Sequence, residues 1–351
     1  MPPESRVSML DIARAVGLHQ TTVSLALRHH PRIPEATRRK ILAAAERLGY
    51  RPNPLVSALM ASRRRRGRGE VQAVIGYVSG DPPDVGGGPI NLGYKDLFDG
   101  ASARAAALGY RLENFWIGDP KMTRARFNRI TATRGIHGLL IAPLSRKTPT
   151  LELDWDRFSS VAYGYSLTSP EVHRILPDFY HSMQTALHRC LEAGFKRPGL
   201  VLATNVDRKA DHLWLSAYLG EQHVNRKLGK VPPLLLPKID VESLANWARR
   251  HRVEAVITID SPPFNRTWTP DGQVKADGRA LPLVLLNLGA NGGPVPGIFI
   301  DREEVGAICI DVLVSLLHRT EKGPPRKAQH VLVKCDWWAP PGWLRHPGKR
   351  D

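Results

Sequence analysis

The sequence is poor in cysteine and has no long apolar run. Three cysteines, Cys190, Cys309 and Cys335, occur in 351 residues, without the paired spacing or the neighbouring histidines of a zinc site. No stretch approaches the roughly 20 apolar residues that span a bilayer, and the N-terminus lacks the apolar core of a signal peptide. We therefore expect reduced thiols, no membrane partner and a cytoplasmic location.

The sequence also lacks the motifs of enzymes and nucleotide-binding proteins. The glycine-rich segment GDPPDVGGGP has neither the G-x-G-x-x-G spacing between a strand and a helix nor a following G-K-S/T. Histidines and serines are numerous, but no H-E-x-x-H or G-x-S-x-G motif organises them. We expect no enzyme activity, no metal and no cofactor, and we interpret the glycine-rich segment as a loop at the edge of a cleft.

Positive charge is abundant and unevenly distributed. Lys and Arg number 50 against 33 Asp and Glu, which gives a net charge of +17 and an isoelectric point near 10.1. The first 70 positions hold fourteen basic and five acidic residues, so more than half of the excess lies there. A polyanion such as double-stranded DNA is therefore the expected partner, contacted mainly by the N-terminal segment.

The spacing of apolar residues predicts a small helical domain followed by an α/β core. Residues 1–51 predict a bundle of three short helices, and residues 52–70 predict a linker that contains a hinge helix and an arginine run. From residue 71 to 351, short apolar runs alternate with helical segments, which indicates doubly wound parallel sheets. The alternation repeats after about residue 178, so we expect two lobes. Their predicted limits are about 71–165 plus 302–320 for lobe 1, and about 166–301 plus 321–340 for lobe 2.

The N-terminal segment has the pattern of a helix-turn-helix. Ala13 lies where two helices would touch, Gly17 lies in the turn, and apolar residues recur at positions that face inward. The second predicted helix, from Gln20 to Arg28, begins at the end that would enter a DNA major groove. Thr22 and Ser24 could donate hydrogen bonds to phosphates. An amphipathic helix pair that docks onto another protein is the alternative.

Two segments, VSMLDIARAVGLHQTTVSLAL and TRRKILAAAERLGYRPNPLVSAL, resemble the DNA-binding domain and hinge of the lactose repressor and galactose repressor family of bacterial regulators. The resemblance is close over residues 7–62. Over the rest of the chain it is limited to the order of the predicted helices and strands. It implies a nucleoid-associated repressor that binds a near-palindromic operator as a homodimer or tetramer, with a core like periplasmic sugar-binding proteins. The C-terminal segment lacks the heptad leucines of a tetramerising helix, so we expect a dimer.

The resemblance assigns base reading to Gln20, Thr21 and Leu25. Arg28, which the helix pattern also turns outward, is expected to contact a phosphate. Leu25 stands where the family commonly has arginine, whose guanidinium can bind a guanine edge bidentately. Leucine offers only apolar contact, for example to a thymine methyl, so we predict an atypical operator. His19 and Pro34 stand where the family commonly has capping serines. Imidazole is a poorer N-cap than a hydroxyl, whereas proline suits the first helical turn.

The resemblance also covers the hinge. Tyr50 and Asn53 match the approach to the hinge helix, where we expect phosphate contacts, and Leu59 matches a leucine that inserts into the minor groove and bends the DNA. The alternative for Leu59 is a surface leucine in a linker. The arginine run is either a solvated spacer or a source of nonspecific phosphate attraction, which we favour. It consists of Arg63, Arg64, Arg65, Arg66 and Arg68.

In the core, the resemblance implies a ligand cleft at the carboxyl ends of the parallel strands. Ile259 stands where the family commonly has an asparagine before the aspartate that matches Asp260. The stretch in which the family commonly has a sugar-binding arginine is also altered: in the matching segment, DRKADHLWLSAYL, the nearest cations are Arg208 and Lys209. Trp214 could stack on a sugar or belong to a helix core. The candidate cleft residues are Asp178, Arg208, Trp214, Asp260 and Asp301.

Three functional hypotheses follow. The first is a regulator whose operator affinity is modulated by a small-molecule effector, of unknown identity and including the sugar class. The second is an effector-independent or architectural DNA-binding protein with a degenerate sensor core. The third is a solute-binding protein or enzyme, which would need the secretion signal or catalytic motif that the sequence lacks.

Overall fold

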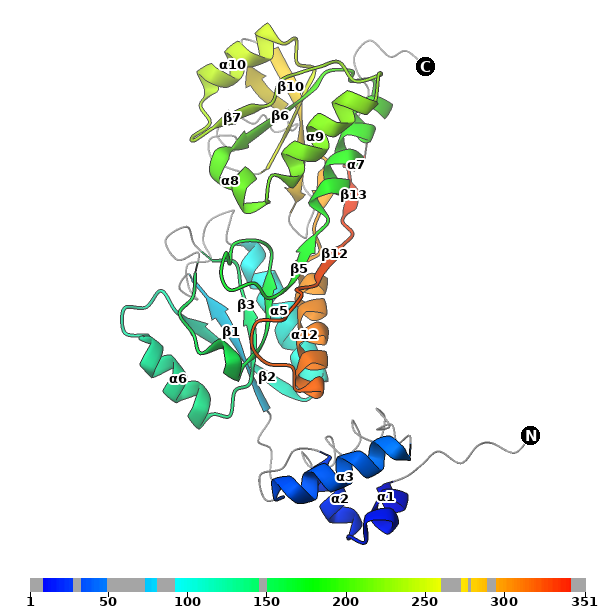
Figure 1. The fold of residues 1–351 in the computed structure, drawn as a ribbon. Coiled ribbons are helices and arrows are strands. Elements are labelled where there is room, and N and C mark those ends of the chain that lie inside the picture. Colours follow the sequence, from blue (N-terminus) through cyan, green and yellow to red (C-terminus); the bar gives the residue numbers. More distant parts are fainter. Residues whose placement is uncertain are drawn as a thin grey trace, which may run out of the picture. The chain divides into compact units, whose positions relative to one another are not determined.

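The computed structural model describes most of the chain, which divides into two compact units, Met1–Val71 and Gln72–Asp351 (Figure 1). Each unit is described by itself. The predicted hinge helix and arginine run lie outside the described residues. The described ranges are 9–27, 33–48, 73–80, 92–144, 150–259, 273–276, 279–288 and 295–341.

The N-terminal unit contains α1 (Met9–Val16), α2 (Gln20–Ala26) and α3 (Glu35–Arg47), as the sequence predicts. Gly17 adopts a φ of +68° in the turn between α1 and α2, a conformation that costs glycine little. Ala13 is buried where the helices meet, and its small side chain permits their close approach. The fully or nearly fully buried residues of this bundle are Ile12, Ala13, Val16, Val23, Ala26, Ile33, Ile41, Ala44 and Ala45.

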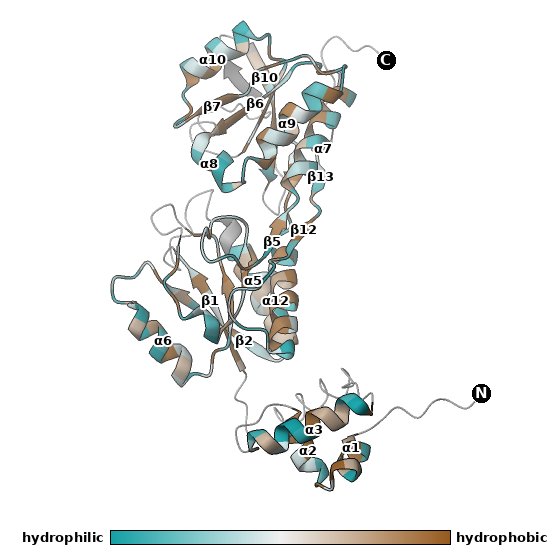
Figure 2. Ribbon diagram, in the orientation of Figure 1, coloured by the Kyte–Doolittle hydropathy of each residue, from teal (hydrophilic) through white to brown (hydrophobic). Residues whose placement is uncertain are grey.

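The first lobe of the core is a six-stranded, entirely parallel sheet in the order β12-β5-β4-β3-β1-β2. Its strands are β1 (Ala73–Ser79), β2 (Tyr110–Trp116), β3 (Gly138–Ile141), β4 (Ser159–Tyr163), β5 (His173–Pro177) and β12 (His330–Val333). β1 is largely hydrophobic along its length (Figure 2), as a strand covered on both faces should be.

Helices cover both faces of this sheet because successive side chains of a strand point to opposite sides. Leu140 packs in the cluster formed with α5 (Leu92–Ala107) and α12 (Arg302–Arg319). Its neighbours Leu139 and Ile141 pack in the cluster on the side of α6 (Arg124–Thr133). A short 3-10 helix, η1 (Trp155–Arg157), precedes β4.

The second lobe is a seven-stranded sheet in the order β13-β11-β10-β8-β6-β7, with β9 paired to β10. Only β9 and β13 run antiparallel to their partners. The strands are β6 (Pro198–Ala203), β7 (Leu234–Leu236), β8 (Ala255–Thr258), β9 (Gln273–Ala276), β10 (Arg279–Leu288), β11 (Gly297–Phe299) and β13 (Asp336–Trp338). The prediction of two doubly wound α/β lobes is confirmed.

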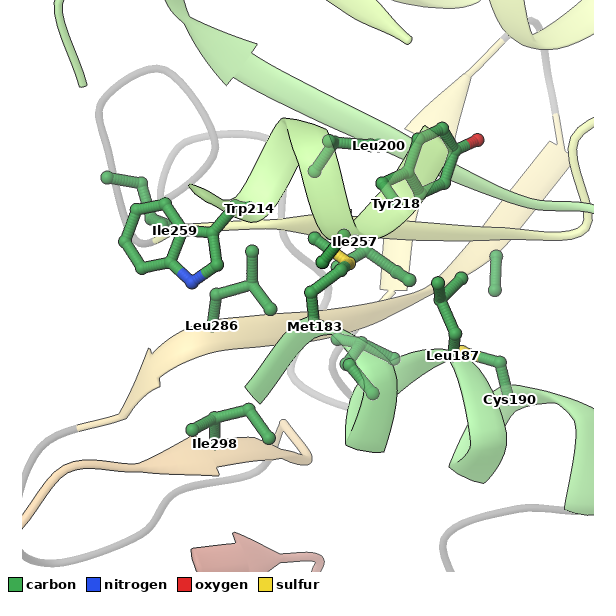
Figure 3. Close-up of a cluster of buried hydrophobic side chains, with 14 of the residues drawn as sticks. Met183, Leu187, Cys190, Leu200, Trp214, Tyr218, Ile257, Ile259, Leu286 and Ile298 are labelled. Atoms are coloured by element: carbon green, nitrogen blue, oxygen red, sulfur yellow. The ribbon is translucent and has the colours of Figure 1, made fainter. Parts of the chain in front are cut away.

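Three helices cover the faces of the second sheet, and a fourth follows β6. α7 (Phe179–Glu192) and α9 (Leu213–Val224) pack on one face, where Met183, Tyr218 and Leu286 meet in a dense apolar core (Figure 3). α10 (Val241–Arg250) packs on the other face. The fourth helix, α8 (Thr204–Lys209), is short and was not apparent in the sequence pattern.

The lobe limits predicted from the sequence need correction. β5 lies in the segment assigned to lobe 2, but it pairs with β4 of lobe 1, and β12 pairs in turn with β5. The run HRILP did not predict a strand because Arg174 and Pro177 interrupt its apolar character. The pairing of β12 joins residues more than 150 positions apart, which local periodicity cannot reveal. The first lobe therefore extends through Pro177 and includes β12.

Two glycines allow α5 and α12 to cross closely. A Cβ on Gly100 would overlap the backbone of Glu303, and a Cβ on Gly306 would overlap the backbone of Leu97. Backbone atoms cannot move aside as a flexible side chain can, so these positions require glycine. The close crossing ties the start of the first lobe to the late helix of the chain.

Gly306→Ala should lower the free energy of unfolding of the core by about 1–3 kcal/mol, because the added methyl group forces the two helices apart. The matched control is Gly220→Ala in α9, where the nearest atom to a new Cβ is the Tyr180 hydroxyl at 3.6 Å. This control should be neutral or more stable by about 0.5–1 kcal/mol. Urea unfolding followed by circular dichroism measures both, and equal stability of the two variants would contradict the role of Gly306.

Candidate functional site

The start of α2 presents two polar side chains to solvent. Gln20 and Thr21, the first residues of α2, are exposed, whereas Thr22 and Ser24 are half-buried. The first amide groups of a helix carry partial positive charge, so this end favours an anionic partner. The exposure of Gln20 and Thr21 is what the base-reading prediction requires.

His19 caps this helix in place of the usual hydroxyl residue. Its Nδ1 accepts a hydrogen bond from the Thr21 amide at 3.3 Å and lies 3.0 Å from Thr21 Oγ1. A ring nitrogen that accepts must be unprotonated, so the proton of the neutral imidazole lies on Nε2. The imidazole thus serves as a cap and also orients the Thr21 side chain. Pro34, at the N-cap of α3, makes no side-chain capping bond.

The Leu25 side chain is less exposed to solvent than the sequence predicted, and so less accessible to DNA. It is half-buried and packs against the core of the bundle together with Leu18 and Met9. Its remaining exposed surface is apolar, so any contact with a base from this position is a van der Waals contact. Arg28, Tyr50, Asn53, Leu59 and the five arginines of the run lie outside the described residues.

The core contains a cavity of about 160 Å³ between the two lobes. Its lining comes from the carboxyl ends of parallel strands in both sheets, namely β3, β4, β5, β6, β10 and β11, or from the residues that follow them. Open α/β sheets bind ligands at this edge. The lining residues are Pro143, Tyr163, Gly164, Tyr165, Ser166, Phe179, Val206, Lys209, Ala210, Trp214, Asn287, Ile300 and Arg302.

Of the candidate cleft residues, Trp214 lines this cavity. Arg208 is exposed and is not part of the lining, whereas its neighbour Lys209 is. Asp178 and Asp301 are also outside the lining: each carboxylate caps a helix. Asp178 accepts from the His181 amide at 3.1 Å, and Asp301 accepts from the Glu304 amide at 3.0 Å. Asp260 lies outside the described residues.

Trp214 belongs both to the hydrophobic core and to the cavity wall. It is 5% exposed, packs in the cluster of α7, α9 and the second sheet (Figure 3), and its ring lies 4.7 Å from that of Phe179. Its indole Nε1 has no hydrogen-bond partner among the described residues. A buried donor without an acceptor costs about 1–3 kcal/mol. The wall therefore combines an aromatic surface with an unsatisfied donor.

A buried arginine supports the loop that forms one side of the cavity. The Arg174 guanidinium donates to the carbonyl oxygens of Gly164 at 2.9 Å and Leu167 at 2.8 Å, and it lies 5.8 Å from the Tyr165 ring centre. Burial lowers the pKa of Arg174, an effect that the carboxylate of Glu171 opposes. Burial raises the pKa of the Tyr165 phenol, and the nearby Asp211 carboxylate adds to this increase.

Sequence reasoning missed several lining residues. Tyr163, Tyr165, Ser166, Asn287 and Arg302 were not among the candidates, although the strand predictions contained a usable signal. Tyr163 is the last residue but one of the run SSVAYG, and Asn287 follows LPLVLL, so both lie at the carboxyl end of a predicted parallel strand. Arg302 offered no such signal, because it begins a helix after the chain has crossed between lobes.

Other kinds of site have little support in the described part of the chain. No group of three His, Cys, Asp or Glu side chains gathers there as metal ligands would. None of its helices combines the length and the apolar character needed to cross a membrane. Burial raises the pKa of the Cys190 thiol to about 12, which keeps it protonated and unreactive near neutral pH.

Comparisons with known proteins agree with this geometry. Residues 8–53 match the family model described as bacterial regulatory proteins, lacI family. The HTH-type transcriptional regulator AglR of Rhizobium meliloti (strain 1021) is 27% identical over 149 residues, which cover 42% of this chain. The match spans 38% of the length of AglR itself.

Two solved structures share the fold of almost the whole chain. The complex of the transcriptional regulator CelR with cellobiose has a TM-score of 0.57 at 17% identity and covers 98% of this chain and 100% of its own. The lac repressor dimer bound to operator and the anti-inducer ONPF has a TM-score of 0.51 at 16% identity and covers 95% and 98% respectively. At these identities the similarity establishes the fold.

His19→Ala should destabilise α2 by about 1 kcal/mol, because the Thr21 amide loses its acceptor, whereas His19→Ser should preserve the cap. The measurement is amide hydrogen exchange of α2 in the full chain, where a loss of this size speeds exchange roughly fivefold. Arg39→Ala, at an exposed position of α3, is the control and should leave α2 unchanged. If His19→Ser exchanges as fast as His19→Ala, His19 is not a cap.

Proposed function

Because residues 8–53 match the model of the lacI family of bacterial regulatory proteins, we propose that this chain is a transcriptional repressor of that family that binds a near-palindromic operator as a homodimer. The observation that carries the proposal is the exposed pair Gln20 and Thr21 at the start of α2, within the segment that matches the family model. Two copies of one reader related by a twofold axis require an operator with two related half-sites.

The division of labour at the DNA follows from chemistry. Gln20 carries both an amide donor and an acceptor and can pair with two atoms of one adenine edge, whereas the Thr21 hydroxyl suits either base type. Thr22 and Ser24 lie on the same short helix and are assigned to phosphates. The arginine run after the hinge adds nonspecific attraction to the DNA backbone, which salt would weaken.

We extend the proposal to a small-molecule effector that binds the interlobe cavity. The cavity is lined from both sheets, so a ligand there contacts both lobes and favours the arrangement in which both contacts form. Coupling to DNA would follow if that arrangement changes how the two hinges meet the operator. The CelR structure, which shares this fold, is a complex with cellobiose, and the lac repressor structure contains an anti-inducer and operator.

Selection of bound sequences from random DNA tests the proposal. We expect a pair of inverted half-sites, and because Leu25 is apolar and half-buried, we expect the half-sites to lack the guanine that an arginine would contact. Footprinting on the genome would then locate the operators. Recovery of no inverted repeat would contradict the proposed function, and recovery of the guanine-bearing half-site would contradict the role of Leu25.

Gln20→Ala and Thr21→Ala should each weaken operator binding by about 1–3 kcal/mol while leaving nonspecific binding nearly unchanged, because both lose base contacts and retain the phosphate contacts. Fluorescence anisotropy with operator and with scrambled DNA separates the two effects. Glu46→Gln, at an exposed position of α3, serves as the control. Equal losses on operator and scrambled DNA would show that these side chains do not read bases.

A further inference from the structure

Two of the described residues that line the interlobe cavity carry a positive charge. Lys209, at the end of α8, and Arg302, at the start of α12, both line it, and the described lining contains no Asp or Glu. Neither cation forms an ion pair with a described carboxylate. The Arg302 guanidinium donates to Asn287 Oδ1, which is a neutral acceptor.

Two described acidic residues, Asp207 and Asp211, lie close in sequence to Lys209 but outside the lining. Asp207, on the same helix as Lys209, is buried and faces the His212 ring, with its Oδ2 2.6 Å from Nδ1. Asp211 is exposed, and its field acts on Tyr165 and Arg174 on the other side of the cavity. The buried Arg174 adds a third positive charge behind the loop of the first lobe. The charged groups in the described lining itself, Lys209 and Arg302, are both cationic, and cationic groups attract an anion.

The hydrogen-bonding capacity of the lining is biased in the same direction. Trp214 Nε1 is a buried donor without a described partner, and Ser166 Oγ already accepts from the Leu144 amide at 2.9 Å, which leaves its hydroxyl hydrogen to donate. The Asn287 oxygen is occupied by Arg302. Sugar hydroxyls need acceptors as well as donors, whereas carboxylate and phosphate oxygens only accept. A lining rich in donors thus suits an anionic group better than a fully neutral polyol.

The size and the aromatic wall limit the rest of the ligand. A closed cavity of about 150 Å³ holds one benzene ring, so a volume of about 160 Å³ accommodates a single six-membered ring, and because this cavity is partly open its substituents can extend toward solvent. Trp214 and Phe179 give part of the lining an aromatic character. The cationic side chains of Lys209 and Arg302 and the aromatic residues Trp214 and Phe179 therefore line the same cavity.

We propose that the interlobe cavity binds a monosaccharide-sized anion, whose carboxylate or phosphate is held by Lys209 and Arg302 while its ring packs against Trp214. The inference rests on the proposed function for its biological meaning, because the anion would be the effector. The binding chemistry itself depends only on the cavity.

Calorimetric titration of the full-length protein, without DNA, tests the binding. The probes are glucose, glucuronate and glucose 6-phosphate, which share a ring and differ in charge, together with inorganic phosphate. Glucuronate or glucose 6-phosphate should bind at least tenfold more tightly than glucose, with an affinity that falls as salt rises. Whichever of the two binds more tightly identifies the anionic group.

Lys209→Met is the principal variant, because the side chain is exposed enough to be replaced without disturbing the fold. It should weaken binding of the preferred anion by roughly 10-fold to 100-fold, the loss expected for a charge-assisted hydrogen bond. Arg302→Gln should have a similar effect. Arg208→Met, one residue away on α8 and outside the lining, is the matched control and should bind as the parent protein does.

Three results would overturn the inference: glucose bound as tightly as the two anions, no binding of either anion at millimolar concentration, or equal losses in the Lys209 and Arg208 variants. Binding of inorganic phosphate as tight as that of glucose 6-phosphate would show an adventitious ion site without a role for the ring. Operator binding is measured separately on the ligand-free protein. If the ligand-free protein bound no operator, the proposed function would be wrong, but the result for the cavity would be unaffected. If an anion bound without changing operator affinity, only the proposed coupling between the cavity and DNA binding would be wrong.

Discussion

The core depends on one constraint, that the carboxyl ends of parallel strands gather at one edge of each sheet. The chain crosses between the sheets after β5, after β11 and after β12, so each lobe is built from two separate segments of the chain. Strand ends from both sheets consequently line a single cavity. The glycine contact between α5 and α12 belongs to the same constraint, since α12 must return to the first lobe and pack where α5 already lies.

Position within this arrangement decides what each polar residue does. Asp178 and Asp301 are alike in chemistry and both follow strands, but each lies at a helix N-terminus and is used by the amides there. Lys209 and Arg302, brought from distant parts of the sequence, are left facing the cavity. The family resemblance points to a ligand cleft, whereas the particular side chains in it argue for the charge of the ligand.

The N-terminal unit shows a different balance between local and long-range effects. Its helices, its turn glycine and its buried face follow from short-range spacing, and all were predicted. The capping role of His19 was underestimated, because a general preference scale cannot show that Nδ1 lies within reach of the Thr21 amide. Leu25 was expected to face outward, but it is half-buried and packs against the core of the bundle.

Local periodicity in the sequence was sufficient for the helix-turn-helix, most strands and helices, and the two-lobed fold class, because each of these depends on residues close together in the chain. Tertiary structure alone decided that β5 and β12 join the first lobe, that Lys209 rather than Arg208 lines the cavity, and that Arg302 and Trp214 share it. These outcomes depend on how strands pair and how helices rotate against a sheet, and such contacts join residues that no local pattern connects.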